Sequence, residues 1–145
     1  MNPLPLGLLP DTAEVLADGS LAIGGCRIDE LAERFGTPLF VYDEAHLRNR
    51  CREAVAAFGP GNAYYATKAF LCTAMARLAY EEGMALDVAS GGELFTALRA
   101  GVPAAALAFH GNNKSVAELR MALQEQVGHV VVDSFEEIDR IEALV

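Results

Sequence analysis

The sequence predicts an α/β fold with a parallel sheet, because strand-like and helix-like segments alternate through most of its 145 residues. Comparable strand positions recur at intervals of 21, 22 and 23 residues: Tyr64, Ala85, Leu107 and Val130. Three expected helices open with the same signature: Ser90-x-x-Glu93, Ser115-x-x-Glu118 and Ser134-x-x-Glu137. In such a capping box the serine oxygen and the glutamate cover N–H groups that the first helical turn leaves free.

Residues 1–36 do not follow this repeat and predict a short β-rich segment. The stretch EVLADGSLAIGG is typical of a hairpin with Asp18-Gly19 at its turn. The stretch DELAERFG then predicts a short helix, with Asp29 as its N-cap and Gly36 as its stop. Residues 1–36 are therefore expected to differ in structure from the rest of the chain.

From Pro38 onward the sequence predicts five strand–helix units, and near-continuous apolar strands are typical of a parallel sheet covered by helices. The expected strands are 38–42, 62–69, 83–89, 105–110 and 128–134. The expected helices are 43–58 with Asp43 as N-cap, one ending at Glu82, 90–101, 115–126 and 135–145. A closed (β/α)8 barrel needs eight units and about 250 residues, whereas an open doubly wound sheet can stop at five. The last expected helix ends in IEALV without a stop residue, so the residues leave either a partial barrel or an open sheet.

The composition argues against several classes of protein. A net charge of −9 opposes nucleic-acid binding, and no apolar stretch reaches the roughly 18 residues that span a membrane. The first ten residues contain three prolines and no basic residue, which makes a poor signal peptide. The three cysteines, Cys26, Cys51 and Cys72, are scattered and typical of reduced thiols. We expect a cytoplasmic protein that binds neither nucleic acid nor membrane.

Lys68 interrupts an apolar strand pattern and is the first candidate for chemistry. Strand alternation would place it on one face with Tyr64 and Ala66, near the carboxyl end of the strand, where parallel α/β folds hold their active sites. In an apolar setting the charged form of a lysine is disfavoured, and its amine can then attack carbonyl compounds such as pyridoxal phosphate. Spacing alone also permits a lysine that merely extends into solvent.

Two further polar groups are expected at the same end of the sheet. Asp87 ends the next strand, where it could face Lys68 or only hydrogen-bond its own loop. His110 opens the loop after the following strand, where polar residues also serve simply to turn the chain. Gly91 and Gly92 resemble a small phosphate cradle, a weak signal. No histidine or cysteine has a partner at metal-ligand spacing, so no metal site is expected.

The stretches YYATKAF and DVASGGEL resemble the Tyr-Ala-x-Lys-Ala-Asn and Asp-Val-x-Ser-x-Gly-Glu-Leu motifs of the fold type III pyridoxal-phosphate decarboxylases. HGNNKS and GTPLFVYDEAHLR resemble the diaminopimelate decarboxylase branch of that family. The resemblance extends from about Leu21 to Val145, with Phe70 in place of the motif's asparagine.

The resemblance implies a partial (β/α)8 TIM-type barrel, about its first five βα units, over residues 37–145. Residues 1–36 would belong to a second, β-rich domain. Lys68 would be catalytic and would bind pyridoxal phosphate covalently, with Asp87 and His110 flanking the cofactor. The implied reaction is decarboxylation of a small amino acid, meso-diaminopimelate, to lysine by a homodimer with shared active sites.

The resemblance also leaves parts of the family's site unaccounted for. Its phosphate loop, the acid that pairs with the pyridine nitrogen and its substrate loop follow the matched region, so the chain is expected to be incomplete and inactive alone. The alternatives are an ornithine or arginine decarboxylase, an alanine racemase-like enzyme, a non-catalytic pyridoxal-phosphate carrier and an inert truncated product. HGNNKS favours the diaminopimelate branch.

Overall fold

The computed structural model describes residues 6–145, so half of the segment examined for a signal peptide lies outside the described residues. The chain divides into two compact units, Met1–Arg50 and Cys51–Val145. The domain boundary expected after residue 36 stays a prediction. No helix in the described part of the chain has both the length and the apolar character needed to cross a membrane.

The first unit contains a small antiparallel sheet in the order β1-β2-β3. The predicted hairpin is confirmed: Leu16 N donates to Ser20 O at 2.8 Å, and Gly19 at the turn has a φ of +86°. A left-handed φ of this kind is readily adopted by glycine. The elements up to the first helix are the 3-10 turn η1 (Leu6–Leu8), β1 (Glu14–Val15), β2 (Leu21–Ile23), β3 (Cys26–Arg27) and α1 (Ile28–Phe35).

Helix α1 begins earlier than the sequence predicts, and Asp29 is not its N-cap. The extended residue Arg27 occupies the cap position because β3 runs directly into the helix. Asp29 lies in the first turn, where its Oδ2 accepts a hydrogen bond from Arg27 Nη2 at 2.6 Å. The predicted stop is confirmed, since Gly36 has a φ of +79° and donates to Ala32 O.

Helix α2 (Glu44–Phe58) has the N-cap that the sequence predicts. Asp43 Oδ1 accepts from His46 N at 3.2 Å, and Oδ2 accepts from the hydroxyl of Thr12. The Thr12 hydrogen bond holds the pKa of Asp43 below its usual value, against the opposing effect of burial. Residues 38–42, in contrast, form no strand, and Phe40 is 85% exposed. An extended segment becomes a strand only when a neighbour completes its hydrogen-bond ladder.

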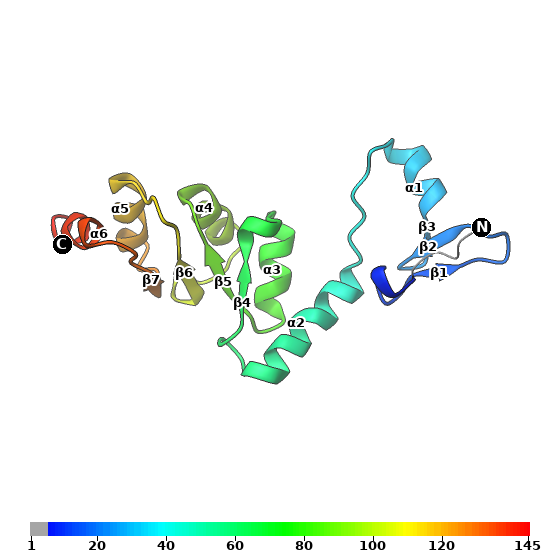
Figure 1. Ribbon diagram of the computed structural model, residues 1–145, viewed down its shortest axis with the longest axis horizontal. Coiled ribbons are helices and arrows are strands. Elements are labelled where there is room, and N and C mark those ends of the chain that lie inside the picture. The colour runs from blue at the N-terminus through cyan, green and yellow to red at the C-terminus, as the bar shows by residue number, and fades with distance from the viewer. Residues whose placement is uncertain (1–5) are drawn as a thin grey trace. The chain divides into compact units, whose positions relative to one another are not determined.

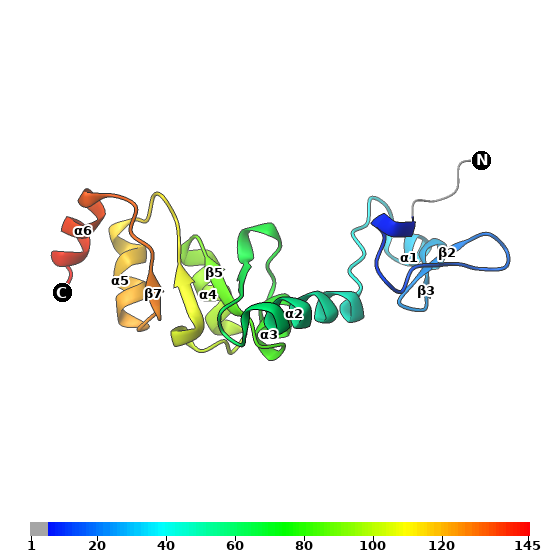
Figure 2. The same ribbon diagram turned by 60° about the horizontal axis from the view of Figure 1, so that its bottom comes forward.

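The second unit confirms the parallel α/β prediction. Its four-stranded sheet has the order β4-β5-β6-β7, all parallel, and each strand is followed by a helix (Figures 1 and 2). The strands are β4 (Tyr64–Ala66), β5 (Ala85–Val88), β6 (Leu107–Phe109) and β7 (His129–Val130). The helices are α3 (Thr73–Glu81), α4 (Gly91–Arg99), α5 (Val116–Gln124) and α6 (Phe135–Glu142), with 3-10 turns η2 (Thr67–Ala69) and η3 (Ala104–Ala106).

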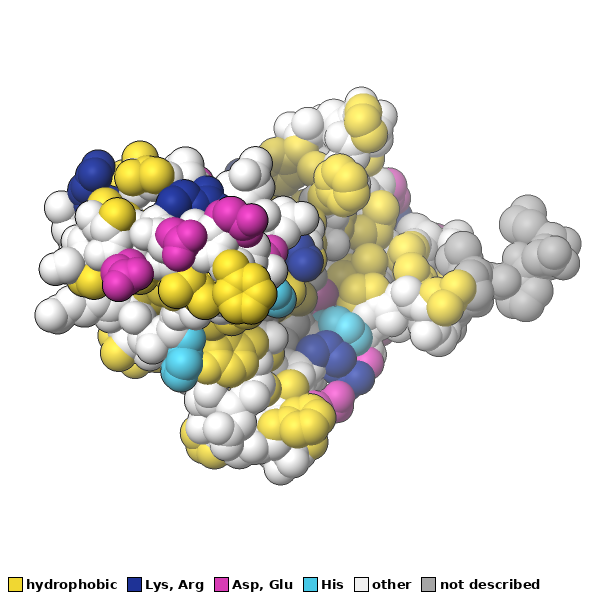
Figure 3. Space-filling view, turned by 60° about the vertical axis from the view of Figure 1, so that its left-hand side comes forward, with side chains coloured by type: hydrophobic (Ala, Val, Ile, Leu, Met, Phe, Trp, Pro, Cys, Tyr) yellow, Lys and Arg dark blue, Asp and Glu magenta, His cyan; other side chains and the backbone are white. Residues whose placement is uncertain are grey.

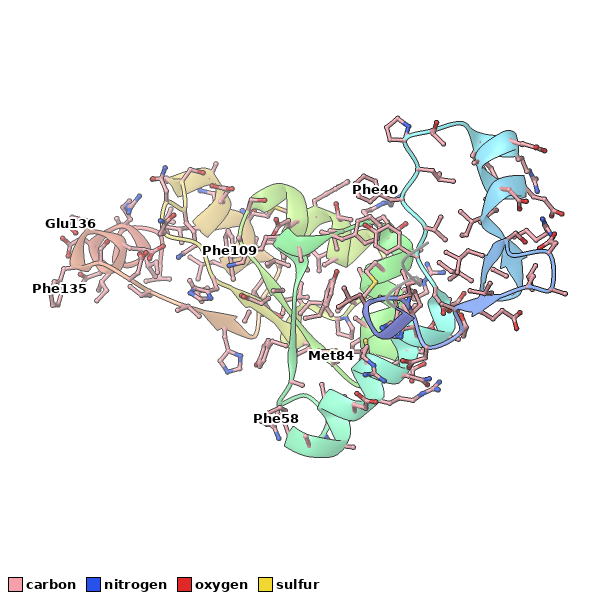
Figure 4. The ribbon with its side chains drawn as sticks, turned by 45° about the vertical axis from the view of Figure 1, so that its right-hand side comes forward. Phe40, Phe58, Met84, Phe109, Phe135 and Glu136 are labelled. Carbon is pink, nitrogen blue, oxygen red and sulfur yellow. The ribbon has the colours of Figure 1, made fainter. Side chains whose placement is uncertain are left out.

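One face of this sheet forms the core against the helices. Val88 and Phe109 are fully buried, as are their neighbours two residues earlier in β5 and β6. Figure 4 labels Phe109 at this sheet and Phe135, which is 84% exposed, on α6. Because successive side chains of a strand point to opposite faces, Asp87 and Ala108 lie on the other face. The sheet therefore has one apolar face against helices, and Asp87 lies on the opposite face.

The three predicted serine caps are confirmed, but only one is a reciprocal capping box. Ser90, Ser115 and Ser134 each accept a hydrogen bond from the N–H three residues later. Of the three glutamates, Glu118 accepts a hydrogen bond from the N–H of its own capping serine, Ser115, at 2.9 Å. Glu93 and Glu137 instead accept from the residue before the cap, at 2.7 and 3.3 Å.

Candidate active site

Lys68 lies directly after β4, in the 3-10 turn η2. The strand alternation that would align it with Tyr64 and Ala66 therefore ends at Ala66, and the expected apolar setting is wrong: Lys68 is exposed. Within residues 6–145 its ammonium has no hydrogen bond or ion pair. Among the described residues, β4 has a ladder neighbour on one side alone.

Only one of the two lysines in the sequence offers an accessible amine. The sequence contains Lys68 and Lys114, and Lys114 is 1% exposed. A carbonyl compound that attaches to a lysine of this folded chain must therefore attach at Lys68.

Thr67, the residue before this lysine, is held against the next strand by its side chain. Its side chain is 1% exposed, and its hydroxyl oxygen lies 2.9 Å from Asp87 O and 2.7 Å from Glu93 Oε2. Glu93 Oε2 also accepts from Ala89 N at 2.7 Å. The sequence pattern identified Glu93 only as a capping residue and gave no role to Thr67, because the contact joins positions 26 residues apart.

Asp87 and His110 are brought into contact at the same edge. Asp87 pairs with Ala66 and Ala108 in the ladder, and His110 N extends that ladder by donating to Val88 O at 2.8 Å. His110 Nδ1 lies 3.5 Å from Asp87 Oδ2. The other carboxylate oxygen, Asp87 Oδ1, is buried and has no hydrogen-bond donor within residues 6–145. Lys68 lies in the turn after the neighbouring strand, and within residues 6–145 no hydrogen bond or ion pair joins it to either side chain.

An open hollow of about 380 Å³ lies on this face, lined by Tyr64, Asp87, Ala108, His110, His129 and Val131. His129 is a residue that the motifs did not single out, and it is placed here by the β6–β7 register. A larger hollow of about 670 Å³ lies toward the amino-terminal ends of the strands, where Tyr64, Ala85 and His129 begin them. The smaller hollow holds the Asp87–His110 pair, whereas Lys68 is not among the residues that line it.

The glycine pair at the start of α4 does not form an open phosphate cradle. Gly91 N already donates to Glu118 Oε1 at 2.7 Å. This bond, with those from Ser115, holds the pKa of Glu118 below its usual value. Gly111, in contrast, is required by packing: a Cβ there would lie 2.5 Å from Ala89 O.

The parallel barrel-type sheet and an accessible lysine at its carboxyl edge define a class of α/β proteins that can hold a carbonyl cofactor covalently. Residues 44–145 match the family described as pyridoxal-dependent decarboxylase, pyridoxal binding domain. The chain belongs to this family, which confirms the expected family and its pyridoxal cofactor.

The relatives extend well beyond the region that this chain covers. The chain is 54% identical over 127 residues to a diaminopimelate decarboxylase of Mycobacterium tuberculosis, covering 87% of this chain and 28% of the relative. Among solved structures, a protein from Aquifex aeolicus has a TM-score of 0.85 at 34% identity, covering 92% of this chain and 33% of its own. Diaminopimelate decarboxylase from M. jannaschii, solved with L-lysine, has a TM-score of 0.81 at 37% identity, covering 92% and 32%. These likenesses confirm the partial barrel.

Proposed function

We propose that the protein to which this chain belongs decarboxylates meso-diaminopimelate to lysine, with pyridoxal phosphate bound to Lys68. The observation that carries the proposal is the accessible amine of Lys68 at the same sheet edge as the Asp87–His110 pair. The names of the relatives support the choice of substrate.

The residues present fit a pyridoxal cofactor. Within residues 6–145 the Lys68 ammonium forms no ion pair, so a carbonyl compound that binds there displaces none. The buried Asp87 Oδ1 has no hydrogen-bond donor among residues 6–145, and an unsatisfied buried acceptor costs about 1–3 kcal/mol. A ligand N–H or O–H would remove that cost. The anionic phosphate would be repelled by Asp87, and Gly91 N is already used, so we expect other parts of the protein to bind the phosphate.

The chain's own groups divide the work in this proposal. Pyridoxal phosphate, when bound, supplies a ring system that accepts the electron pair left by a departing carboxylate. Lys68 Nζ would hold the cofactor, and this amine could also take up and return a proton at this edge of the sheet. Asp87 Oδ2 orients the His110 ring, and Asp87 Oδ1 stays free to accept a hydrogen bond.

Release of labelled carbon dioxide by the full-length protein tests the proposal. We expect the rate with meso-diaminopimelate to exceed the rates with ornithine and arginine by about tenfold or more, since one extra polar contact discriminates at least this well. Comparable or higher rates on ornithine would overturn the substrate assignment and leave the cofactor assignment standing.

The homodimer with shared active sites, the cytoplasmic location and the assignment of residues 1–36 to a second β-rich domain are further parts of this proposal. Free, exposed thiols at Cys26 and Cys72 suit a reducing compartment. Light scattering during size-exclusion chromatography of the full-length protein should give the mass of a dimer. A fully active monomer would contradict shared active sites.

A further inference from the structure

Lys114 and Glu137 form a fully buried ion pair beside the candidate site. Their side chains are 0% and 1% exposed, and Lys114 Nζ lies 2.8 Å from Glu137 Oε1. Burial alone would raise the pKa of Glu137, but the Lys114 ammonium and the Asp133 N–H hold it below its usual value. The carboxyl group of Glu137 therefore stays ionised at neutral pH although almost none of its side chain is exposed to solvent.

The ammonium of Lys114 also binds two backbone carbonyls from different segments. Nζ donates a short hydrogen bond to Gly111 O and another, of 2.8 Å, to Val131 O, just after β7. Lys114 O in turn accepts from Arg140 Nη1 at 3.0 Å. The side chain of Lys114 thus ties the loop after β6 to the end of β7 and, through Glu137, to the first turn of α6, while its carbonyl binds Arg140 in the last turn of that helix.

This loop is the one that carries His110. His110 N is bonded to Val88 O, and the carbonyl of the next residue, Gly111, is bonded to Lys114. Gly111 also lies against Ala89 O so closely that no Cβ would fit. The backbone on both sides of His110 is therefore fixed, and its ring is left 3.5 Å from Asp87 Oδ2.

Stability alone does not explain the pair. A buried ion pair is often no more stabilising than apolar residues of the same volume, because both charges lose their hydration. Apolar side chains cannot bind the carbonyls of Gly111 and Val131, however. What the pair supplies, and an apolar pair would not, is the geometry of the loop.

We propose that Lys114 and Glu137 are positioning residues that hold the loop 110–113 so that His110 faces Asp87. The inference rests on the proposed function, since His110 is there assigned to the cofactor site. It predicts that replacing both charges by apolar groups leaves the protein folded, loosens this loop and weakens cofactor binding.

The test compares the full-length protein with Lys114→Met/Glu137→Met, which removes both charges together. A matched control is Arg52→Met/Glu82→Met, because this pair makes an ion pair at 2.6 Å between α2 and the end of α3, away from the loop. Hydrogen–deuterium exchange is followed in the cofactor-free proteins, and pyridoxal-phosphate affinity is measured by absorbance titration. We expect exchange at 110–113 to rise about tenfold or more in the first variant alone, and its affinity to fall about tenfold.

Two outcomes would overturn the positioning role. One is unchanged exchange in the loop of the first variant, and the other is a uniform rise across all peptides, which would assign the pair to overall stability. If the double variant fails to fold, Lys114→Arg is used instead, because it keeps the positive charge and should still pair with Glu137. Its hydrogen–deuterium exchange in the loop should be faster than in wild type and slower than in Lys114→Met. Exchange in Lys114→Arg equal to that of Lys114→Met would then refute the role of the charge.

A double-mutant cycle that combines the methionine changes with His110→Ala separates this inference from the proposed function. If the pair acts through His110, the double methionine change should lower affinity little further in the His110→Ala background. If the fold losses of affinity from the two changes multiply instead, the ion pair acts through groups other than His110. A wild-type protein that binds no pyridoxal phosphate would contradict the proposed function, while the exchange measurement would still decide whether the pair holds the loop.

Discussion

Lys68 and Lys114 are chemically identical side chains that the fold uses in opposite ways. Lys114 is buried, donates hydrogen bonds to two carbonyls and forms an ion pair with a carboxylate, so its amine is not available to a ligand. Lys68 stands in an exposed turn with no partner among residues 6–145. Lys68 is therefore accessible because it lies in the turn η2. The preceding residue, Thr67, is fixed by its own buried hydroxyl group.

We expect Lys68→Ala to abolish covalent cofactor attachment and decarboxylase activity in the full-length protein. Borohydride reduction followed by peptide mapping should locate the adduct at Lys68 in the wild type and find none in this chain's residues in the variant. Arg99→Ala is the control, because it removes an exposed cation from the last turn of α4. An adduct that persists in Lys68→Ala would refute the assignment.

Thr67→Val should cost about 1–3 kcal/mol in the free energy of unfolding, because Glu93 loses a buried hydrogen bond while the side-chain shape is kept. Urea denaturation of the full-length protein measures the change. Thr73→Val alters an exposed threonine at the start of α3 and should change stability by less than about 0.5 kcal/mol. Equal effects of the two changes would show that the buried hydroxyl has no special role.

At the scale of elements, the helix caps join consecutive loops as well as ending helices. The glutamate three residues after each capping serine reaches the loop of the preceding unit. Glu93 contacts Thr67, Glu118 contacts Gly91 and Glu137 contacts Lys114. Each helix start is thereby tied to the carboxyl edge of the neighbouring strand, which is the edge that carries the site.

The lowered pKa of Glu118 predicts a pH dependence of stability. A carboxyl group whose pKa is lower in the folded state stabilises the protein above its unfolded pKa of about 4.3, and this contribution is lost as the pH falls through the folded pKa. Glu118→Gln should therefore destabilise the protein at pH 7, and the difference from wild type should shrink below about pH 4. Glu125→Gln, at an exposed position that ends α5, is the matched control.

Chemical denaturation at several pH values measures both variants. A deficit of Glu118→Gln that is the same at low and neutral pH would contradict the role of its charge.

At the scale of the whole molecule, the parallel sheet ends at β4 on one side and β7 on the other. Within residues 6–145 neither strand has a second ladder partner, and unpaired strand edges bind other chains. Apolar side chains are also exposed, among them Phe135 and Ile138 of α6, and Figure 3 shows hydrophobic side chains open to solvent beside acidic ones. The described residues thus leave both edges and several large side chains uncovered.

We therefore expect the 145-residue chain, expressed alone, to self-associate and to release no carbon dioxide from meso-diaminopimelate. Size-exclusion chromatography and the release assay on the same sample check both points. A compact monomer that turns over the substrate would show that this chain suffices for the whole reaction.

The sequence by itself determined the order of the elements and the edge at which chemistry collects. Hydrophobic periodicity, serine caps and the Asp18-Gly19 turn act within a few residues of one another, so they can be identified before the chain folds. They predicted the hairpin and the parallel sheet, and the resemblance of YYATKAF gave the family that the comparisons confirm. They also put Lys68 inside a strand over 62–69, whereas β4 ends at Ala66 and Lys68 lies in the turn η2 that follows it.

Only the tertiary structure decided which of these groups are buried and which are paired. Residues 38–42 have the pattern of a strand but no neighbour within residues 6–145 to complete a ladder, and Asp29 is held by Arg27 instead of capping α1. Lys114 sits in a polar stretch yet is buried, because Val131, 17 residues later, and Glu137 close over it. Burial and ion pairing depend on strand register and on groups distant in sequence, which no local pattern specifies.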